Sequence, residues 1–192
     1  LQSSSAASDV YKRQSLYFEK LSGSFLYNST FLWDCISFAD IFLNNNGKNV
    51  RAILSYIWNL RSLPTYFQQL EMESLGKQSS PKSRFKHTGQ IIFGGYGPTA
   101  QHSYFQLLHQ GTQDICADII STSDDEKSLS VAQAITQSEL LANGENEIEL
   151  ENEFKINGNV PTNLFLMKKF NAFNLGYLIA SWEHRTFITA SM

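Results

Sequence analysis

The sequence has few cysteines, few prolines and no excess of positive charge. Of its 192 residues two are Cys and four are Pro, and the net charge is −3. Cys35 and Cys116 stand far apart, with no Cys or His at metal-ligand spacing, so neither a disulfide framework nor a zinc site is indicated. The 15 Lys and Arg residues are scattered along the chain, which argues against nucleic acid and anionic membranes as partners.

Long hydrophobic runs and a secretory leader are also missing. No run of about 18 apolar residues lacks a polar interruption, so no transmembrane helix is expected. Residues 1–14, LQSSSAASDVYKRQ, lack the apolar region of a signal sequence and resemble translated sequencing-adapter read-through, so they are interpreted as a non-native tail. A reduced, cytoplasmic protein is the expectation.

The remaining segments predict a globular α/β protein. Hydrophobic residues make up 42% of the chain, which is enough for a real core. Residues 15–48 are rich in aromatics without a clean period, so this segment stays ambiguous and partly helical. Beyond it, apolar spacing predicts helices over 50–58, 63–75, 100–110, 129–143 and 172–187, and strands over 89–93, 114–120 and 163–167. This alternation predicts a three-layer α/β/α sandwich with a mainly parallel sheet, while the acidic run 145–153 is expected to face water.

One face of the predicted helix over 63–75 carries a candidate acid–base pair. Gln69 and Glu73 are four residues apart and share a face, opposite the apolar side that Phe67 and Leu70 form. A partly desolvated glutamate beside an amide donor suits a base that takes a proton from carbon and returns it. The alternative is an ordinary solvated helix face, which is the expectation for Glu71.

A second candidate is His102, which follows the glycine-rich run GGYGPT over 94–99. It is predicted in the first turn of a helix, where backbone N–H groups and the helix dipole favour an anion such as a sugar phosphate. A histidine there could shuttle protons. The alternative is a capping or packing histidine, because GGYGPT matches no nucleotide-binding motif.

Four runs occur in the order in which they occur in the glucose-6-phosphate isomerase family, and the chain resembles the later part of that family over about 49–192. The matching runs are LPTYFQQLEMESLGK (63–77), HTGQIIFGGYGPTAQHSYFQLLHQGT (87–112), GNVPTN (158–163) and LGYLIASWEHRTF (175–187). The resemblance implies that 49–192 is an incomplete second sugar isomerase (SIS) domain. It also implies interconversion of glucose 6-phosphate and fructose 6-phosphate through a cis-enediol, with no metal or organic cofactor.

The same resemblance assigns roles to three residues. Glu73 matches the family's general base, and Gln69 matches a glutamine that lines the substrate site. His102 matches the histidine associated with ring opening, which in the family reaches the site from the neighbouring subunit. A homodimer with a sugar phosphate substrate is therefore implied.

Several family features have no match in these residues. The Gln-Trp-Gly-Val-Glu-Leu-Gly-Lys motif with the catalytic lysine and the phosphate-binding loop of the first SIS domain are not found, and the active-site arginine falls at Ser24. Val160 stands where an arginine is usual. Little or no turnover is expected of the 192-residue chain alone. Two alternatives are a non-catalytic sugar-phosphate-binding SIS module, in which Glu73 is structural, and a decayed or chimeric gene model.

Overall fold

The computed structural model describes residues 24–124, 128–145 and 155–192, with side chains described from residue 32 onward. The predicted tail over 1–14 lies outside these ranges. So does the predicted water-facing acidic run, apart from its first residue.

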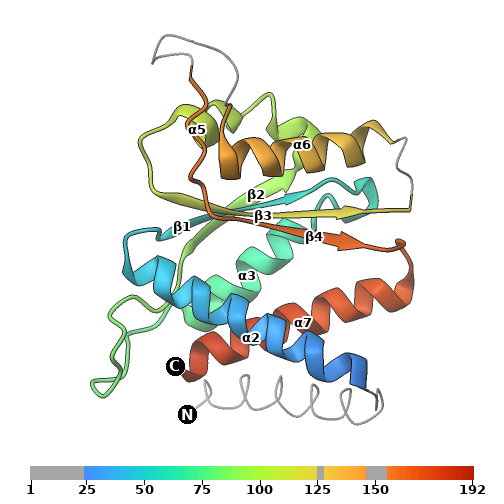
Figure 1. Ribbon diagram of the computed structural model, residues 1–192. Coiled ribbons are helices and arrows are strands. Elements are labelled where there is room, and N and C mark those ends of the chain that lie inside the picture. Colours follow the sequence, from blue (N-terminus) through green and yellow to red (C-terminus); the bar gives the residue numbers. More distant parts are fainter. Residues whose placement is uncertain (1–23, 125–127, 146–154) are drawn as a thin grey trace.

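The centre of the molecule is a four-stranded parallel sheet with strand order β2-β1-β3-β4 (Figure 1). Its strands are β1 (Val50–Ser55), β2 (Ile91–Tyr96), β3 (Ile115–Thr122) and β4 (Thr162–Met167). The two central strands, β1 and β3, are buried almost throughout, as expected for a parallel sheet that is covered on both faces.

Helices cover both faces of the sheet, so the predicted three-layer α/β/α sandwich is confirmed (Figure 1). On one face lie α2 (Ser24–Asn45), α3 (Leu63–Leu75) and α7 (Ala172–Ser191). On the other lie α4 (Gly97–Ala100), α5 (Phe105–Gln110) and α6 (Leu129–Asn143). A short 3₁₀ helix, η1 (Trp58–Leu60), joins β1 to α3.

Stacked aromatic rings hold the layer of α2, α3 and α7 against the sheet. Trp182 of α7 is fully buried and stacks on Phe67 of α3 with ring centroids 4.0 Å apart. Trp33 of α2 stacks on Phe165 of β4 at 5.1 Å. Because aromatic side chains bury large areas with specific geometry, these contacts fix how the three helices pack.

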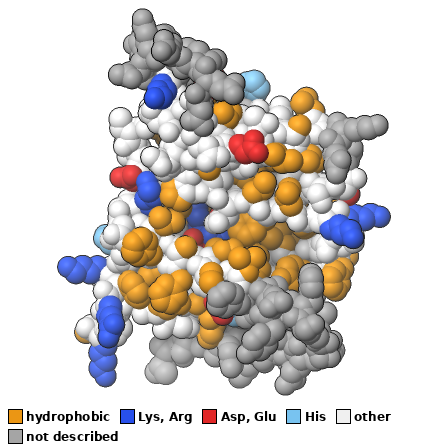
Figure 2. Space-filling view, viewed as in Figure 1, with side chains coloured by type: hydrophobic (Ala, Val, Ile, Leu, Met, Phe, Trp, Pro, Cys, Tyr) orange, Lys and Arg blue, Asp and Glu red, His pale blue; other side chains and the backbone are white. Residues whose placement is uncertain are grey.

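The outer side of α2 remains apolar and open to solvent. Leu32, Phe38 and Phe42 are 58%, 58% and 64% exposed, and Phe38 and Phe42 are four residues apart, so these two share one side of the helix. Figure 2 shows hydrophobic side chains gathered over the part of the molecule that α2 crosses.

The predicted helix over 50–58 is wrong, because these residues form β1 and η1. Val50, Ile53 and Leu54 fit a helical period by coincidence. A strand buried on both faces is apolar at nearly every position, so periodicity cannot distinguish it from a buried helix. By contrast, the helices predicted over 63–75 and 129–143 are confirmed, and the helix predicted from residue 172 continues to Ser191.

The glycine-rich run over 94–99 does not form a loop before a helix. The helix predicted over 100–110 is interrupted. Gly94 belongs to β2 and Gly97 opens α4, while a turn over 101–104 separates α4 from α5. At Gly94 a Cβ would lie 1.8 Å from the carbonyl oxygen of Ile53 on β1. This glycine therefore serves strand packing rather than a ligand-binding loop.

Candidate functional site

Gln69 and Glu73 lie together on the solvent-facing side of α3. The Nε2 atom of Gln69 donates a long hydrogen bond of 3.5 Å to Oε2 of Glu73, and both side chains are exposed. The shared face is thus confirmed. The expected partial desolvation of Glu73 is not present in the described part of the chain, because the carboxylate is open to solvent.

The opposite side of α3 carries a buried glutamate, Glu71, which the sequence predicts at the surface. Glu71, expected at the surface, is only 4% exposed. Its carboxylate accepts a hydrogen bond from the guanidinium of Arg51 on β1 and another, of 2.6 Å, from the indole N–H of Trp182 on α7. The spacing of buried positions Phe67, Glu71 and Leu75 turns this side toward the sheet. The partners stand 20 and 111 residues away along the chain, so no local pattern could reveal them.

Glu71 belongs to a buried ionic cluster, made up of Asp40, Arg51, Glu71, Asp118 and Arg185. Arg185 donates from Nε and Nη2 to Asp40 at 2.6 and 2.8 Å, and from Nη1 to Asp118 at 2.8 Å. Nη1 of Arg51 lies 3.1 Å from Asp40. The ionic cluster therefore connects all three helices of this layer to the two central strands.

Mutual attraction keeps this ionic cluster charged despite its burial. Burial alone would raise the pKa of Asp40, but Arg185 and Arg51 outweigh it and hold that pKa below its ordinary value of 3.8. Burial would lower the pKa of Arg185, but Asp118 and Asp40 outweigh it and raise that pKa. Groups held in their charged forms in this way are suited to structure rather than to proton transfer at neutral pH.

His102 lies apart from the pair on α3. It is exposed in the turn between α4 and α5, where its backbone N–H donates to Thr99 O at 3.1 Å. The predicted position in the first turn of a helix is wrong, and α4 has only four residues. Since α5 packs with α6 and α3 packs with α7, His102 and Glu73 belong to opposite helical layers (Figure 1). One copy of the chain does not bring them together.

Two other histidines have structural partners. A ring nitrogen of His109 lies 2.8 Å from Oε1 of Gln137, and burial lowers the pKa of His109 although this contact opposes the shift. A ring nitrogen of His184 lies 2.8 Å from Oδ1 of Asp34. These contacts agree with packing roles for both histidines.

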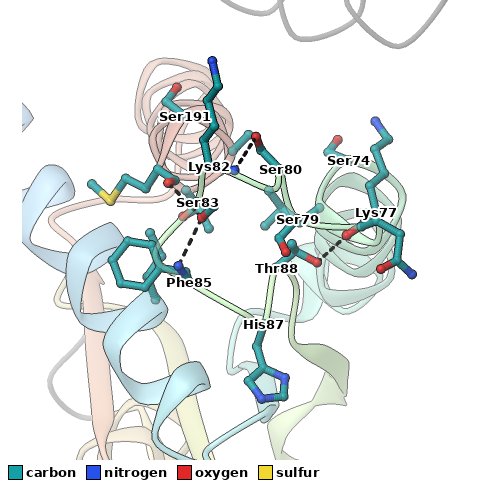
Figure 3. A pocket seen from close by; sticks show the side chains of 16 residues that line it. Ser74, Lys77, Ser79, Ser80, Lys82, Ser83, Phe85, His87, Thr88 and Ser191 are labelled. Carbon is teal, nitrogen blue, oxygen red and sulfur yellow. Dashed lines mark hydrogen bonds between the residues drawn. The ribbon is translucent and has the colours of Figure 1, made fainter.

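A cavity of about 540 Å³ opens beside the C-terminal end of α3, between the α3–β2 connection and the end of α7 (Figure 3). Its lining has hydroxyl and ammonium groups but no Asp or Glu; among the lining residues are Ser74, Lys77, Ser79, Ser80, Lys82, Ser83 and Thr88. Figure 3 shows Lys77 and Lys82 extending outward from its rim. The hydroxyl groups of the lining and the ammonium groups at its rim are donors that can bind an anionic group such as a phosphate, and the lining also includes Met192, whose O accepts from Ser83 Oγ at 3.4 Å.

Within the described residues, no group of three or more His, Cys, Asp or Glu side chains is placed to hold a metal ion. In the same ranges no helix has the length and apolar character needed to cross a membrane.

The fold and the pair on α3 define an α/β protein with a helix-covered parallel sheet and an exposed carboxylate–amide pair. The sequence profile described as phosphoglucose isomerase matches residues 32–192, which is most of the chain. The chain belongs to the phosphoglucose isomerase family.

Individual relatives agree with this assignment. Glucose-6-phosphate isomerase 2 of Neisseria meningitidis serogroup A is 38% identical over 161 residues, covering 72% of this chain and 29% of the relative. Glucose-6-phosphate isomerase of Acinetobacter baumannii is 35% identical over 172 residues, covering 76% of this chain and 31% of the relative. The chain thus spans about 30% of the length of these relatives.

Solved structures show the same architecture. A crystal structure of a glucose-6-phosphate isomerase from Chlamydia trachomatis superposes with a TM-score of 0.69 at 27% identity, covering 80% of this chain and 32% of that one. A hypothetical protein from Thermus thermophilus, 19% identical, superposes with a TM-score of 0.61 over 80% of this chain and 38% of that one. The latter similarity supports the fold alone.

Proposed function

We propose that this chain is part of a glucose-6-phosphate isomerase, which interconverts glucose 6-phosphate and fructose 6-phosphate in glycolysis and gluconeogenesis. Membership of the family and the names of the relatives support the reaction. The observation that carries the proposal is the exposed pair of Glu73 and Gln69 within the family-like run over 63–77. A cytoplasmic location is part of the proposal, because glycolytic sugar phosphates are cytoplasmic.

In the proposed mechanism Glu73 is the base. Its carboxylate takes the proton from C2 of the open-chain aldose, and the electron pair of that C–H bond forms the C1–C2 double bond while the C1=O π pair moves to O1, giving the cis-enediolate. A proton passes from O2 to O1. The carboxyl group then returns its proton to C1, the C1–C2 π pair forms the new C–H bond, and an electron pair on O2 forms the C2=O bond of the ketose. The amide of Gln69 would orient the carboxylate or the substrate. A positioned general base of this kind contributes about 10²–10⁴-fold to rate.

The proposed ring-opening group is His102 of a second copy of the chain. Within one copy His102 belongs to the opposite helical layer from Glu73, so a site that uses both residues needs two copies. A homodimer is therefore part of the proposal.

The test uses a chimera, because the chain spans about 30% of its relatives. Residues 32–192 replace the matched segment of the Neisseria relative, and isomerisation is followed in a coupled assay. We expect activity that falls about 10²–10⁴-fold in Glu73→Gln. The matched control Glu139→Gln, at an exposed position on α6, should leave the rate unchanged. A folded, active chimera that is indifferent to Glu73→Gln would rule out this role. The 192-residue chain alone is expected to show little or no turnover.

The cavity favours a second candidate, a sugar-phosphate-binding module without catalysis. In that case the isolated chain binds fructose 6-phosphate in calorimetry, and Lys77→Ala with Lys82→Ala abolishes the binding. Replacing Lys168 and Lys169, an exposed pair elsewhere, is the matched control. Binding that depends on Glu73 instead would favour the isomerase site.

A further inference from the structure

We propose that Glu71 is a positioning residue for Glu73: held by Arg51 and Trp182, it fixes the rotation of α3 so that the face that carries Gln69 and Glu73 points into solvent. The inference rests on the proposed function, since it concerns the proposed base. The family resemblance assigns no role to the buried carboxylate of Glu71.

The geometry of α3 points Glu71 and Glu73 in nearly opposite directions. Residues two positions apart on an α-helix point about 200° apart, so Glu71 and Glu73 face nearly opposite directions. Glu71 is buried against the sheet while Glu73 is exposed. Any rotation of α3 about its axis that loosens Glu71 must therefore redirect Glu73.

Arg51, the partner of Glu71, is itself fixed in the sheet. Arg51 lies on the central strand β1 and is itself only 1% exposed. Besides Glu71 it has Asp40 at 3.1 Å and Asp118 at 3.6 Å as ion-pair partners, while its Nε and Nη1 atoms make no hydrogen bond within the described residues. A carboxylate bound to this guanidinium is fixed relative to the sheet.

Trp182 of α7 contacts α3 over two successive turns. The ring of Trp182 stacks on Phe67, and its N–H donates to Glu71 one turn further along α3. Stacking limits tilt, and the directional hydrogen bond limits rotation. A functional side chain is held in a productive direction by neighbours that are locked in this way.

An apolar residue at position 71 could not replace the carboxylate of Glu71. A leucine at position 71 would fill the same face but leave the buried guanidinium of Arg51 without this partner, and removing one partner of a buried pair is destabilising. A leucine also cannot accept the two hydrogen bonds that define the orientation of the helix. The carboxylate thus supplies direction as well as charge compensation.

The experiment uses a contact between α3 and the sheet, because a rotation of α3 moves Gln69 and Glu73 together. Nε2 of Gln68 on α3 donates to Ile92 O on β2 at 2.5 Å, so the nuclear Overhauser effect between this amide and Ile92 in the 192-residue chain reports how α3 is turned. Glu71→Gln should weaken this effect at least about twofold, because the hydrogen bonds that fix the rotation are altered. The control Glu139→Gln, at an exposed position on α6, should leave it as in the wild type.

A merely stabilising role predicts a different result: a lower unfolding temperature with an unchanged Gln68–Ile92 contact. That outcome in folded Glu71→Gln protein overturns the proposal. If Glu71→Gln fails to fold, Trp182→Phe takes its place, because it keeps a ring against Phe67 and removes the N–H donor together with part of the buried indole. Failure of both variants to fold also overturns the proposal, as the contacts would then serve the fold itself. No substrate enters this measurement, so an inactive or Glu73-independent chimera tests the proposed function separately.

Discussion

At the scale of single residues, Arg185 is the side chain whose loss should be felt most. It is 1% exposed and neutralises Asp40 and Asp118 together. Arg185→Met would leave both carboxylates with a single guanidinium, and removing one partner of a buried pair costs about 3–5 kcal/mol of unfolding free energy. The measurement is urea unfolding at neutral pH. Arg61→Met is the control, because exposed Arg61 rests over the ring of Trp58 at 4.5 Å and should cost less than about 1 kcal/mol.

The depressed pKa of Asp40 sets the direction of acid sensitivity. The folded-state pKa lies below 3.8, so the unfolded chain binds this proton first as the pH falls. The stabilisation is fully present above about pH 3.8 and is lost as the pH falls through the lower folded-state value. Urea unfolding between neutral pH and pH 3 should show this loss in the wild type and a smaller one in Arg185→Met. An equal acid dependence in both would contradict the assignment.

The residues of α3 show how far local pattern reaches. Helical spacing is enough to place Gln69 and Glu73 on one face, because that depends only on the period of the helix. It could not name the groups that compensate the buried Glu71, since Arg51 and Trp182 come from β1 and α7. A glutamate at a core-facing position of an amphipathic helix was the available signal, and it indicates a buried cation nearby.

At the scale of elements, the contact between β1 and β2 depends on Gly94. A Cβ there would lie 1.8 Å from Ile53 O, so Gly94→Ala must push the strands apart. We expect a loss on the order of 1–3 kcal/mol or more in unfolding free energy. The neighbouring Gly95→Ala is the control, because its Cβ would meet only the Tyr104 hydroxyl at 3.6 Å. Similar thermal stability of the two variants would show that the strands can adjust.

The same strands mark the limit of prediction at this scale. Helices exposed on one side, such as α3 and α6, keep a readable period, so the spacing of their apolar residues predicts their extent closely. The central strand β1 was misassigned because burial on both faces erases the alternation that identifies a strand. The alternating order of elements elsewhere still predicted the parallel sheet.

At the scale of the whole molecule, the outer side of α2 should govern how the chain behaves in solution. Phe38 and Phe42 are 58% and 64% exposed and lie one turn apart on the same side of α2, and large contiguous apolar patches are uncommon on monomeric soluble proteins. We expect concentration-dependent self-association of the 192-residue chain in analytical ultracentrifugation.

Replacing Phe38 and Phe42 tests whether the outer side of α2, rather than exposed apolar residues in general, drives the self-association. Phe38→Ser with Phe42→Ser should shift the association to higher concentration, because both rings are largely exposed and their loss removes apolar area that association would bury. Leu129→Ser with Phe173→Ser is the matched control, since these residues are 74% and 59% exposed but lie on α6 and α7. Equal effects of the two pairs would mean that no single face drives association. A monodisperse wild-type monomer at every concentration would remove α2 as the cause, because exposed rings that bury no area on contact supply no driving force for assembly.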